Sequence, residues 1–146
     1  MVPDTLYVLG CGETMRRIKR RLGHDGTLLG VDVALGGRII AADVSADRLE
    51  RLTAGNIATG KVRVIVSVTG GQGFVFGRGN QQIAASLLAR IGRDGVTIVT
   101  GHSKLINLDP ACLRVDTGDV SVDAMLAGYV RVETGPGRSM IMRIAA

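Results

Sequence analysis

The stretch that decides how this chain folds is Thr69-Gly70-Gly71-Gln72-Gly73-Phe74-Val75-Phe76-Gly77-Arg78-Gly79-Asn80. It follows the β-branched run 62–68, which predicts a buried strand, and it precedes the run 80–91, which predicts a helix. At a strand-to-helix loop, backbone N–H groups can converge on an anion, and the helix N-terminus adds partial positive charge. The alternative is a surface loop whose glycines serve turns and whose phenylalanines fill the core. We favour a ligand-binding loop, because five glycines beside a charge exceed what a turn requires.

Glycine lets a phosphate approach the backbone where a Cβ atom would block it. Arg78 has the fork geometry that binds phosphate in a bidentate manner. No Gly-Lys-Ser/Thr follows the loop, so it is not a Walker loop. The predicted nucleotide contacts of this loop are Gly70, Gly71, Gln72, Gly73, Arg78, Gly79 and Asn80.

Strand and helix patterns alternate along the rest of the chain. Strands are predicted at 5–9, 27–34, 38–43, 62–68, 96–100 and 113–115, helices at 13–22, 45–52, 80–91 and 120–127, and a hairpin at 128–133 with 138–144. Gly36-Gly37 is a two-residue hairpin signal between two of the strands. This alternation predicts a single α/β domain over residues 1–146, with a mixed β-sheet, glycine-rich strand-to-helix loops and a C-terminal β-hairpin.

The composition limits the classes of function. The chain has 146 residues, of which 46% are hydrophobic and 21% charged, which excludes intrinsic disorder. No apolar run reaches the roughly 20 residues that cross a bilayer, and no secretory signal is visible, so we expect a cytoplasmic protein with no membrane partner. Two distant cysteines, Cys11 and Cys112, predict core fillers and neither a disulfide framework nor a metal site.

Glycine and charge point to an anionic small-molecule partner. Glycine accounts for 21 of the 146 residues, well above the usual roughly 7%. The net charge is +5 and the isoelectric point is near 9.9. Nucleic acid is not favoured, because only four aromatic side chains could stack on bases.

A second glycine loop, Gly10-Cys11-Gly12-Glu13-Thr14, lies between strand 5–9 and helix 13–22. It lacks the third glycine of a dinucleotide fingerprint. We interpret Gly10, Gly12 and Thr14 as a possible second anion site, and a plain turn remains equally open.

Polar residues near two later strands complete the candidate site. Lys104 follows strand 96–100, where α/β sheets place ligands, so it is either a phosphate contact or a solvated lysine. Asp116, Thr117 and Asp119 lie at a turn before a helix. They could hold ribose hydroxyls or Mg²⁺, or Asp119 could simply cap the helix. No catalytic residue is assigned.

Two further features favour structural roles. Asp32 stands in an apolar strand, where an unpaired carboxylate would be costly, so we expect a salt bridge. The basic run 16–21 predicts the solvated face of a helix, and a docking surface for an acidic partner is the alternative.

Several segments together resemble a known family. They are the loop 70–82, Lys104-Leu105, Val115-Asp116-Thr117-Gly118-Asp119, Tyr7-Val8-Leu9-Gly10 with Gly12, and the segment 27–32. In this order they are similar to the C-terminal part of ATP-NAD kinase-like proteins, the branch that includes the acetoin-catabolism X proteins. The resemblance implies phosphoryl transfer from ATP or polyphosphate to the adenosine ribose of NAD, giving NADP. It implies ATP and NAD as ligands, allows Mg²⁺ in a full-length protein, and offers an α+β sandwich as the alternative fold.

By the same resemblance, Gly71, Gln72, Gly73, Arg78 and Asn80 are the strongest candidate contacts to the dinucleotide. The family's Gly-Gly-Asp-Gly-Thr motif, which supplies a phosphate loop and a catalytic aspartate from an N-terminal domain, does not occur in this sequence. We therefore expect nucleotide binding without NAD phosphorylation by this chain alone. The expected partners are a separate N-terminal domain or further copies of the chain. The alternatives are a non-catalytic regulatory module and a sugar-phosphate isomerase-like domain.

Overall fold

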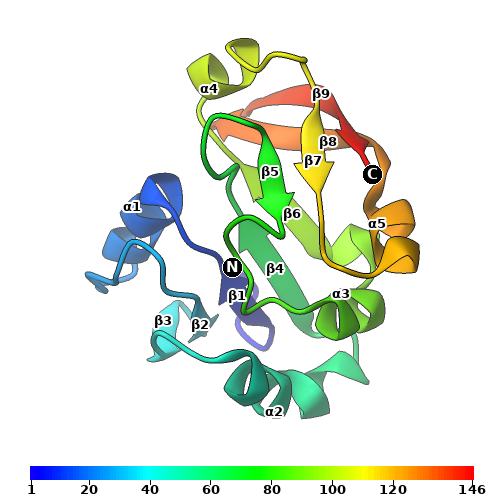
Figure 1. Cartoon of the computed structure of the whole chain (residues 1–146). Coiled ribbons are helices and arrows are strands. Elements are labelled where there is room, and N and C mark those ends of the chain that lie inside the picture. Colours follow the sequence, from blue (N-terminus) through cyan, green and yellow to red (C-terminus); the bar gives the residue numbers. More distant parts are fainter.

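The computed structural model describes all 146 residues as one mixed nine-stranded sheet with five α-helices (Figure 1). The strands are β1 (Leu6–Leu9), β2 (Asp32–Leu35), β3 (Arg38–Ala41), β4 (Val62–Val66), β5 (Phe74–Phe76), β6 (Val96–Val99), β7 (Leu113–Val115), β8 (Gly128–Gly135) and β9 (Arg138–Ala145). The helices are α1 (Glu13–Arg21), α2 (Ala46–Ile57), α3 (Ala85–Ile91), α4 (His102–Ile106) and α5 (Val120–Leu126), with a 3₁₀ turn at Arg93–Gly95. The predicted α/β class, mixed sheet and C-terminal hairpin are confirmed.

The strand order is β3-β2-β1-β4-β6-β8-β9-β7-β5. Strands β1, β4, β6 and β8 run parallel to one another, so their carboxyl ends meet at one edge of the sheet. The predicted hairpin between β2 and β3 turns on Gly36 and Gly37, both at positive φ (60° and 76°), as a two-residue turn of this hand requires.

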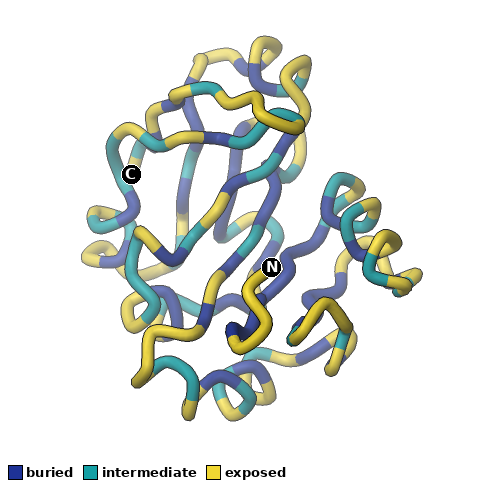
Figure 2. Tube along the Cα trace, turned by 180° about the vertical axis from the view of Figure 1, so that it is seen from behind, coloured by how far each residue is buried: buried dark blue, intermediate teal, exposed yellow.

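The end of the sheet that carries β7 and β5 curls over its middle. Figure 1 shows these two strands in front of β6 and β8. Phe76 of β5 and Val115 of β7 line a small internal cavity together with Ile98 of β6 and Val130 of β8. Strands β1, β2 and β5 are buried along almost their whole length, whereas β8 and β9 keep exposed residues, and many connecting turns are exposed (Figure 2). A second, smaller core lies under α1, where Met15 packs with residues of β1 and β2.

The glycine loop differs from the prediction in two ways. Residues Phe74–Phe76 form strand β5 inside it, and the next helix begins only at Ala85. Asn80 has a φ of 58° and is excluded from that helix. The predicted helix start at residue 80 is wrong. The partial positive charge of this helix's N-terminus therefore does not lie at the end of the loop, where it was expected to favour an anion. An apolar stretch of three residues is too short to show a strand period, which is why β5 escaped prediction.

Two other boundaries need correction, and one helix is added. The predicted strand 27–34 begins only at Asp32, and residues 27–30 form a loop that becomes part of the site. Helix α2 continues through Gly55 to Ile57, because Leu52 and Ile57 both pack against the core. Helix α4 was not predicted. No helix of the structure is both long and apolar enough to span a membrane.

Candidate functional site

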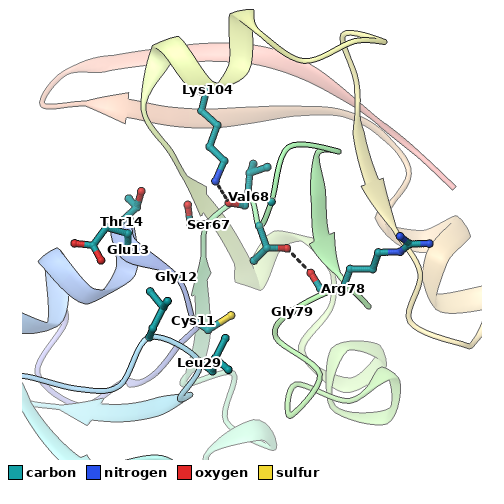
Figure 3. Close-up of a pocket in the computed structure, with 13 residues that line it drawn as sticks. Cys11, Gly12, Glu13, Thr14, Leu29, Ser67, Val68, Arg78, Gly79 and Lys104 are labelled. Carbon is teal, nitrogen blue, oxygen red and sulfur yellow. Dashed lines mark hydrogen bonds between the residues drawn. The ribbon is translucent and has the colours of Figure 1, made fainter.

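A cavity of about 340 Å³ opens at the carboxyl ends of β1, β4 and β6 (Figure 3). Its walls come from residues 11–14, 28–29, 67–70 and 78–79, and Lys104 of α4 reaches in from one side. The two glycine loops, predicted as separate sites, therefore border the same space. The free thiol residues Cys11 and Cys112 are both buried, as predicted, and Cys11 also lines this cavity.

Asn80 ties the two glycine loops together. Its Oδ1 accepts a hydrogen bond from the backbone N–H of Cys11 at 2.7 Å, and its Nδ2 donates to the carbonyl oxygen of Val75 at 2.9 Å. The Asn80 side chain is buried. A Cβ at Gly10 would lie 2.5 Å from Asn80 Oδ1, so Gly10 permits the approach of the loops. Both polar ends of Asn80, predicted as a nucleotide contact, are engaged inside the protein.

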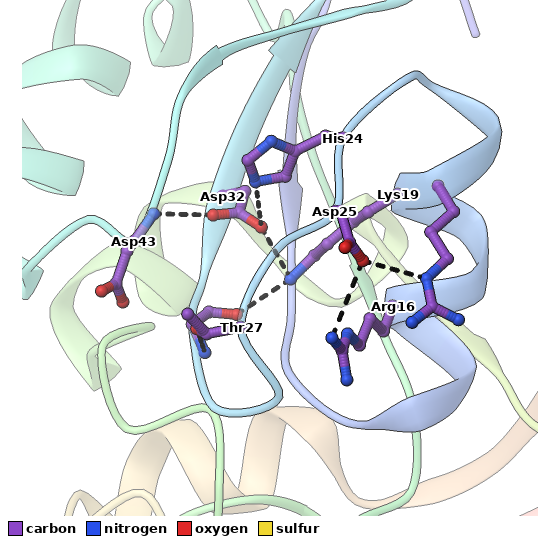
Figure 4. Close-up of polar contacts among 9 residues, drawn as sticks. Arg16, Lys19, His24, Asp25, Thr27, Asp32 and Asp43 are labelled. Carbon is purple, nitrogen blue, oxygen red and sulfur yellow. Dashed lines mark hydrogen bonds and ion pairs between the residues drawn. The ribbon is translucent and has the colours of Figure 1, made fainter.

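The loop 27–30 forms the third wall of the cavity. The N–H of Gly12 donates to the carbonyl oxygen of Leu28 at 2.8 Å. On its inner side, Lys19 Nζ donates to the carbonyl oxygen of Gly30 at 2.9 Å and lies 2.9 Å from Asp32 Oδ2 (Figure 4). Asp32 Oδ1 accepts from the N–H of Asp43 at 2.6 Å. The salt bridge predicted for Asp32 is confirmed.

Lys19 also corrects the interpretation of the basic run 16–21. Its side chain is only 1% exposed, since it lies one turn after buried Met15 on the inner face of α1. The arginines of the run are more exposed. Asp25 accepts a hydrogen bond from Arg20 at 3.1 Å and faces Arg16 at 3.7 Å (Figure 4). The bond from Arg20 holds the pKa of Asp25 below its ordinary value.

Lys104 is the one lysine that enters the cavity. Its Nζ donates to the carbonyl oxygen of Val68 at 2.7 Å (Figure 3). The neighbouring Ser67 is 2% exposed and lines the cavity, and its hydroxyl has no hydrogen-bond partner in the structure. Sequence reasoning missed Ser67, because it continues an apolar strand pattern and carries no motif.

Arg78 contributes its backbone to the cavity and turns its side chain away. Figure 3 shows the side chain leaving the cavity. Its Cζ lies 4.9 Å from the centroid of the Phe74 ring, and Nη1 donates to Gln72 Oε1 at 3.2 Å. The carbonyl oxygen of Arg78 accepts from the hydroxyl of Thr69. In this conformation neither Arg78 nor Gln72 presents a side-chain donor to the cavity.

Two of the five glycines of the long loop allow close backbone packing. A Cβ at Gly73, which has a φ of 82°, would lie 2.7 Å from the carbonyl oxygen of Cys112, and one at Gly77 would overlap the backbone of Asp116. A Cβ at Gly79 would lie 2.8 Å from Thr69 Cγ2. Gly70 lines the cavity, and Gly71 has open space around it. Close packing of backbone on backbone therefore explains why Gly73 and Gly77 are glycines.

The acidic turn before α5 lies outside the cavity lining. Asp119 caps α5, its Oδ1 accepting from the N–H groups of Ser121 and Val122 at 2.9 and 3.2 Å. The hydrogen bond from the Ser121 hydroxyl lowers the pKa of Asp119. Thr117 donates through its N–H and hydroxyl to Asp123 Oδ1 at 3.0 and 2.6 Å. The helix-cap alternative is therefore what the structure shows. No group of three or more His, Cys, Asp or Glu side chains is arranged to hold a metal ion.

Comparison with known families agrees with the resemblance. A family model described as the ATP-NAD kinase C-terminal domain matches residues 3–144, nearly the whole chain. The chain belongs to this family. No curated protein and no solved structure matches it. Within this ATP-NAD kinase C-terminal domain, both glycine loops and the cavity they border lie inside the matched residues.

Proposed function

We propose that this ATP-NAD kinase C-terminal domain binds a nucleotide in the cavity between its two glycine loops, with NAD or NADP as the first candidates. The observation that carries the proposal is the position of the cavity at the carboxyl ends of parallel strands β1, β4 and β6, with a lysine amino group inside it. Ligands of open α/β sheets bind at this edge, because loops and backbone N–H groups converge there. Family membership supports a dinucleotide over other ligands.

The loops are held together before any ligand arrives. Asn80 joins the long loop to Cys11, and Gly12 joins the short loop to Leu28. Gln82 Nε2 donates to the carbonyl oxygen of Leu29 at 3.3 Å. This bond joins the segment after the long loop to the loop 27–30, so each of the three walls is hydrogen-bonded to the other two. A site with fixed walls loses less conformational entropy on binding, which favours affinity.

The proposal assigns binding, and not complete catalysis, to this chain. Phosphoryl transfer from ATP or polyphosphate to NAD requires a base, a metal and a phosphate clamp in one place. The family resemblance attributes the phosphate loop and catalytic aspartate to a Gly-Gly-Asp-Gly-Thr motif, which this sequence lacks. The resemblance allows Mg²⁺ in a full-length protein, and this chain is not assigned a Mg²⁺ site. A cytoplasmic location, and a partner that is either a separate domain or a further copy, belong to the same proposal.

Thermal unfolding with NAD, NADP, ATP and ribose 5-phosphate tests the proposal. A ligand at about 100 times its Kd adds roughly 2.7 kcal/mol, which is readily visible as a rise in Tm. Thr14→Phe, which enlarges a side chain of the cavity lining, should abolish the rise. Thr97→Phe, at an exposed position of β6 outside the cavity, is the matched control and should retain it.

Three outcomes separate the candidate functions. A rise with NAD or NADP supports a dinucleotide site. A cooperative transition that no nucleotide moves contradicts it and favours a binding or regulatory module that recognises another partner. A rise with ribose 5-phosphate alone contradicts it in favour of the sugar-phosphate isomerase-like alternative.

A further inference from the structure

The Ser67 hydroxyl is the most informative atom of the cavity. Ser67 follows directly on β4, is 2% exposed, and makes no hydrogen bond within the protein. Figure 3 shows its oxygen on the wall of the cavity. Ser67 Oγ is not one of the fully buried side-chain atoms that lack a partner, so its oxygen opens into the cavity, where a ligand or water can bind it. The hydroxyl therefore offers a polar ligand atom one donor and one acceptor inside the cavity.

Lys104 brings positive charge to the same place. Its amino group has three donors and spends one on the carbonyl oxygen of Val68, the residue after Ser67. That bond holds the ammonium next to the Ser67 backbone. Two donors remain for a ligand. An ammonium and a hydroxyl side by side suit a group with several acceptor oxygens and negative charge.

The N-terminus of α1 borders the same cavity, because β1, which precedes it, pairs in parallel with β4, which precedes Ser67. The helix has nine residues and starts after Gly12 without a side-chain cap, so the N–H groups of its first turn have no capping partner. Gly12 and Thr14 both line the cavity, and a Cβ at Gly12 would meet nothing within 4 Å. The helix dipole adds partial positive charge there. The carboxylate of Glu13 acts against an anion, but it is 52% exposed and lies 3.8 Å from Arg17.

We propose that Lys104, Ser67 and the first turn of α1 form a phosphate seat within the cavity. This inference deepens the proposed function, on which it rests, by naming the part of the ligand that each group binds. The seat takes a tetrahedral phosphate group, either that of a nucleotide or free inorganic phosphate and pyrophosphate. Arg78, the cation that the sequence favours, lies outside the seat because its guanidinium packs over Phe74.

Isothermal titration with NAD and with inorganic pyrophosphate tests the seat in four proteins: wild type, Lys104→Met, Ser67→Ala and Arg78→Met. Loss of a charged donor to phosphate should weaken binding of both ligands at least tenfold in Lys104→Met. Ser67→Ala should weaken it about threefold or more. Arg78→Met is the matched control, since it removes a cation from the same loop system, and its Kd should stay within about twofold of wild type.

Ser67→Ala also shows whether weaker binding is caused by loss of the fold. The hydroxyl makes no internal hydrogen bond, so its removal should leave Tm unchanged or slightly raised while pyrophosphate affinity falls. In wild type, pyrophosphate should compete with NAD, and its affinity should fall as salt rises.

Two results would overturn the seat. If NAD binds wild type but Lys104→Met and Ser67→Ala bind both ligands as tightly as wild type, the seat is wrong and the proposed function stands. If Arg78→Met alone weakens binding tenfold, the phosphate lies on the long loop instead. If pyrophosphate binds as expected and no nucleotide binds, the seat stands and the proposed nucleotide function fails.

Discussion

The Asn80 side chain accepts a hydrogen bond from the backbone N–H of Cys11 at 2.7 Å across 69 positions of sequence. The same side chain donates to Val75, so a single amide holds the short glycine loop, the long glycine loop and strand β5 in register. Asn tolerates the φ of 58° at this position better than most residues do. This amide makes one cavity out of two loops that look independent in the sequence.

Replacing Asn80 tests that role. Asn80→Ala leaves the Cys11 N–H and the Val75 carbonyl without partners, and each orphaned buried group costs about 1–3 kcal/mol of unfolding free energy. Asn80→Asp keeps the acceptor for Cys11 but buries an unpaired carboxylate beside the Val75 carbonyl oxygen, so its loss should be at least as large. Urea unfolding measures the unfolding free energy of both Asn80 variants. Gln81→Ala, at the exposed neighbouring position, is the control. Equal midpoints for Asn80→Ala and Gln81→Ala would contradict the role.

Two glycines of the site region should respond in opposite ways to an added methyl group. In Gly10→Ala, the new Cβ would lie 2.5 Å from Asn80 Oδ1 and 2.8 Å from Val66 Cγ1, and such overpacking costs about 1–3 kcal/mol. Gly71→Ala meets nothing within 4 Å and has no positive φ, so it should be neutral or stabilise by up to about 1 kcal/mol. Chemical unfolding of the pair gives the comparison. A Gly10→Ala protein as stable as Gly71→Ala would show that the loops can move apart freely.

The buried pair of Lys19 and Asp32 should be strongly coupled. Lys19→Met leaves a buried carboxylate unpaired and should cost about 3–5 kcal/mol of unfolding free energy. Asp32→Leu should be similarly costly, because it strands the ammonium. The double variant removes both charges and should lose much less than the sum of the two single losses. A double-mutant cycle by denaturant titration measures the coupling, and additive losses would mean that the pair does not interact.

The same pair should influence ligand affinity, because Lys19 also binds the Gly30 carbonyl behind the Leu28 wall of the cavity. We expect the double variant to fold yet bind NAD more weakly than wild type. If the folded double variant binds NAD as tightly as wild type, the ion pair does not support the cavity wall.

The stability of the protein should depend on pH through Asp119, and the sign follows from its role as a helix cap. The Ser121 hydrogen bond lowers the folded-state pKa of Asp119 below the ordinary value of 3.8. Its contribution to stability is therefore fully present above that value and is lost as pH falls through the folded pKa. Asp119→Ala should be less stable than wild type at pH 7, and the difference should shrink at the acid end of the range. Guanidinium unfolding at a series of pH values checks this.

Ser121→Ala gives an independent check on the cause. Without the hydroxyl donor, the pKa of Asp119 should move up towards its ordinary value, which a carboxyl NMR titration measures directly. An unchanged pKa would mean that the backbone N–H groups of Ser121 and Val122 account for the shift instead.

Local patterns were sufficient for most elements of the fold. Strand β4, helix α1 and the C-terminal hairpin follow from period and turn residues that act over a few positions, and the structure agrees with all three. The helix start was wrongly predicted at residue 80 because Asn is a residue type that often caps a helix. In the structure the Asn80 side chain instead accepts a hydrogen bond from the distant short loop. Strand β5 was missed because its three residues are too few to show a strand period, and its main pairing is with β7, about forty positions later along the chain.

The sequence by itself determined the α/β class, the family and the two glycine loops, since these depend on local pattern and on motif. Only the tertiary structure decided which side chains face the cavity. It turned Arg78 onto Phe74, engaged Asn80 and Asp119 within the protein, and left Ser67 unpartnered beside Lys104. The physical reason is that a side chain's direction depends on hydrogen-bond partners and packing neighbours far away in sequence, and a linear motif does not contain them.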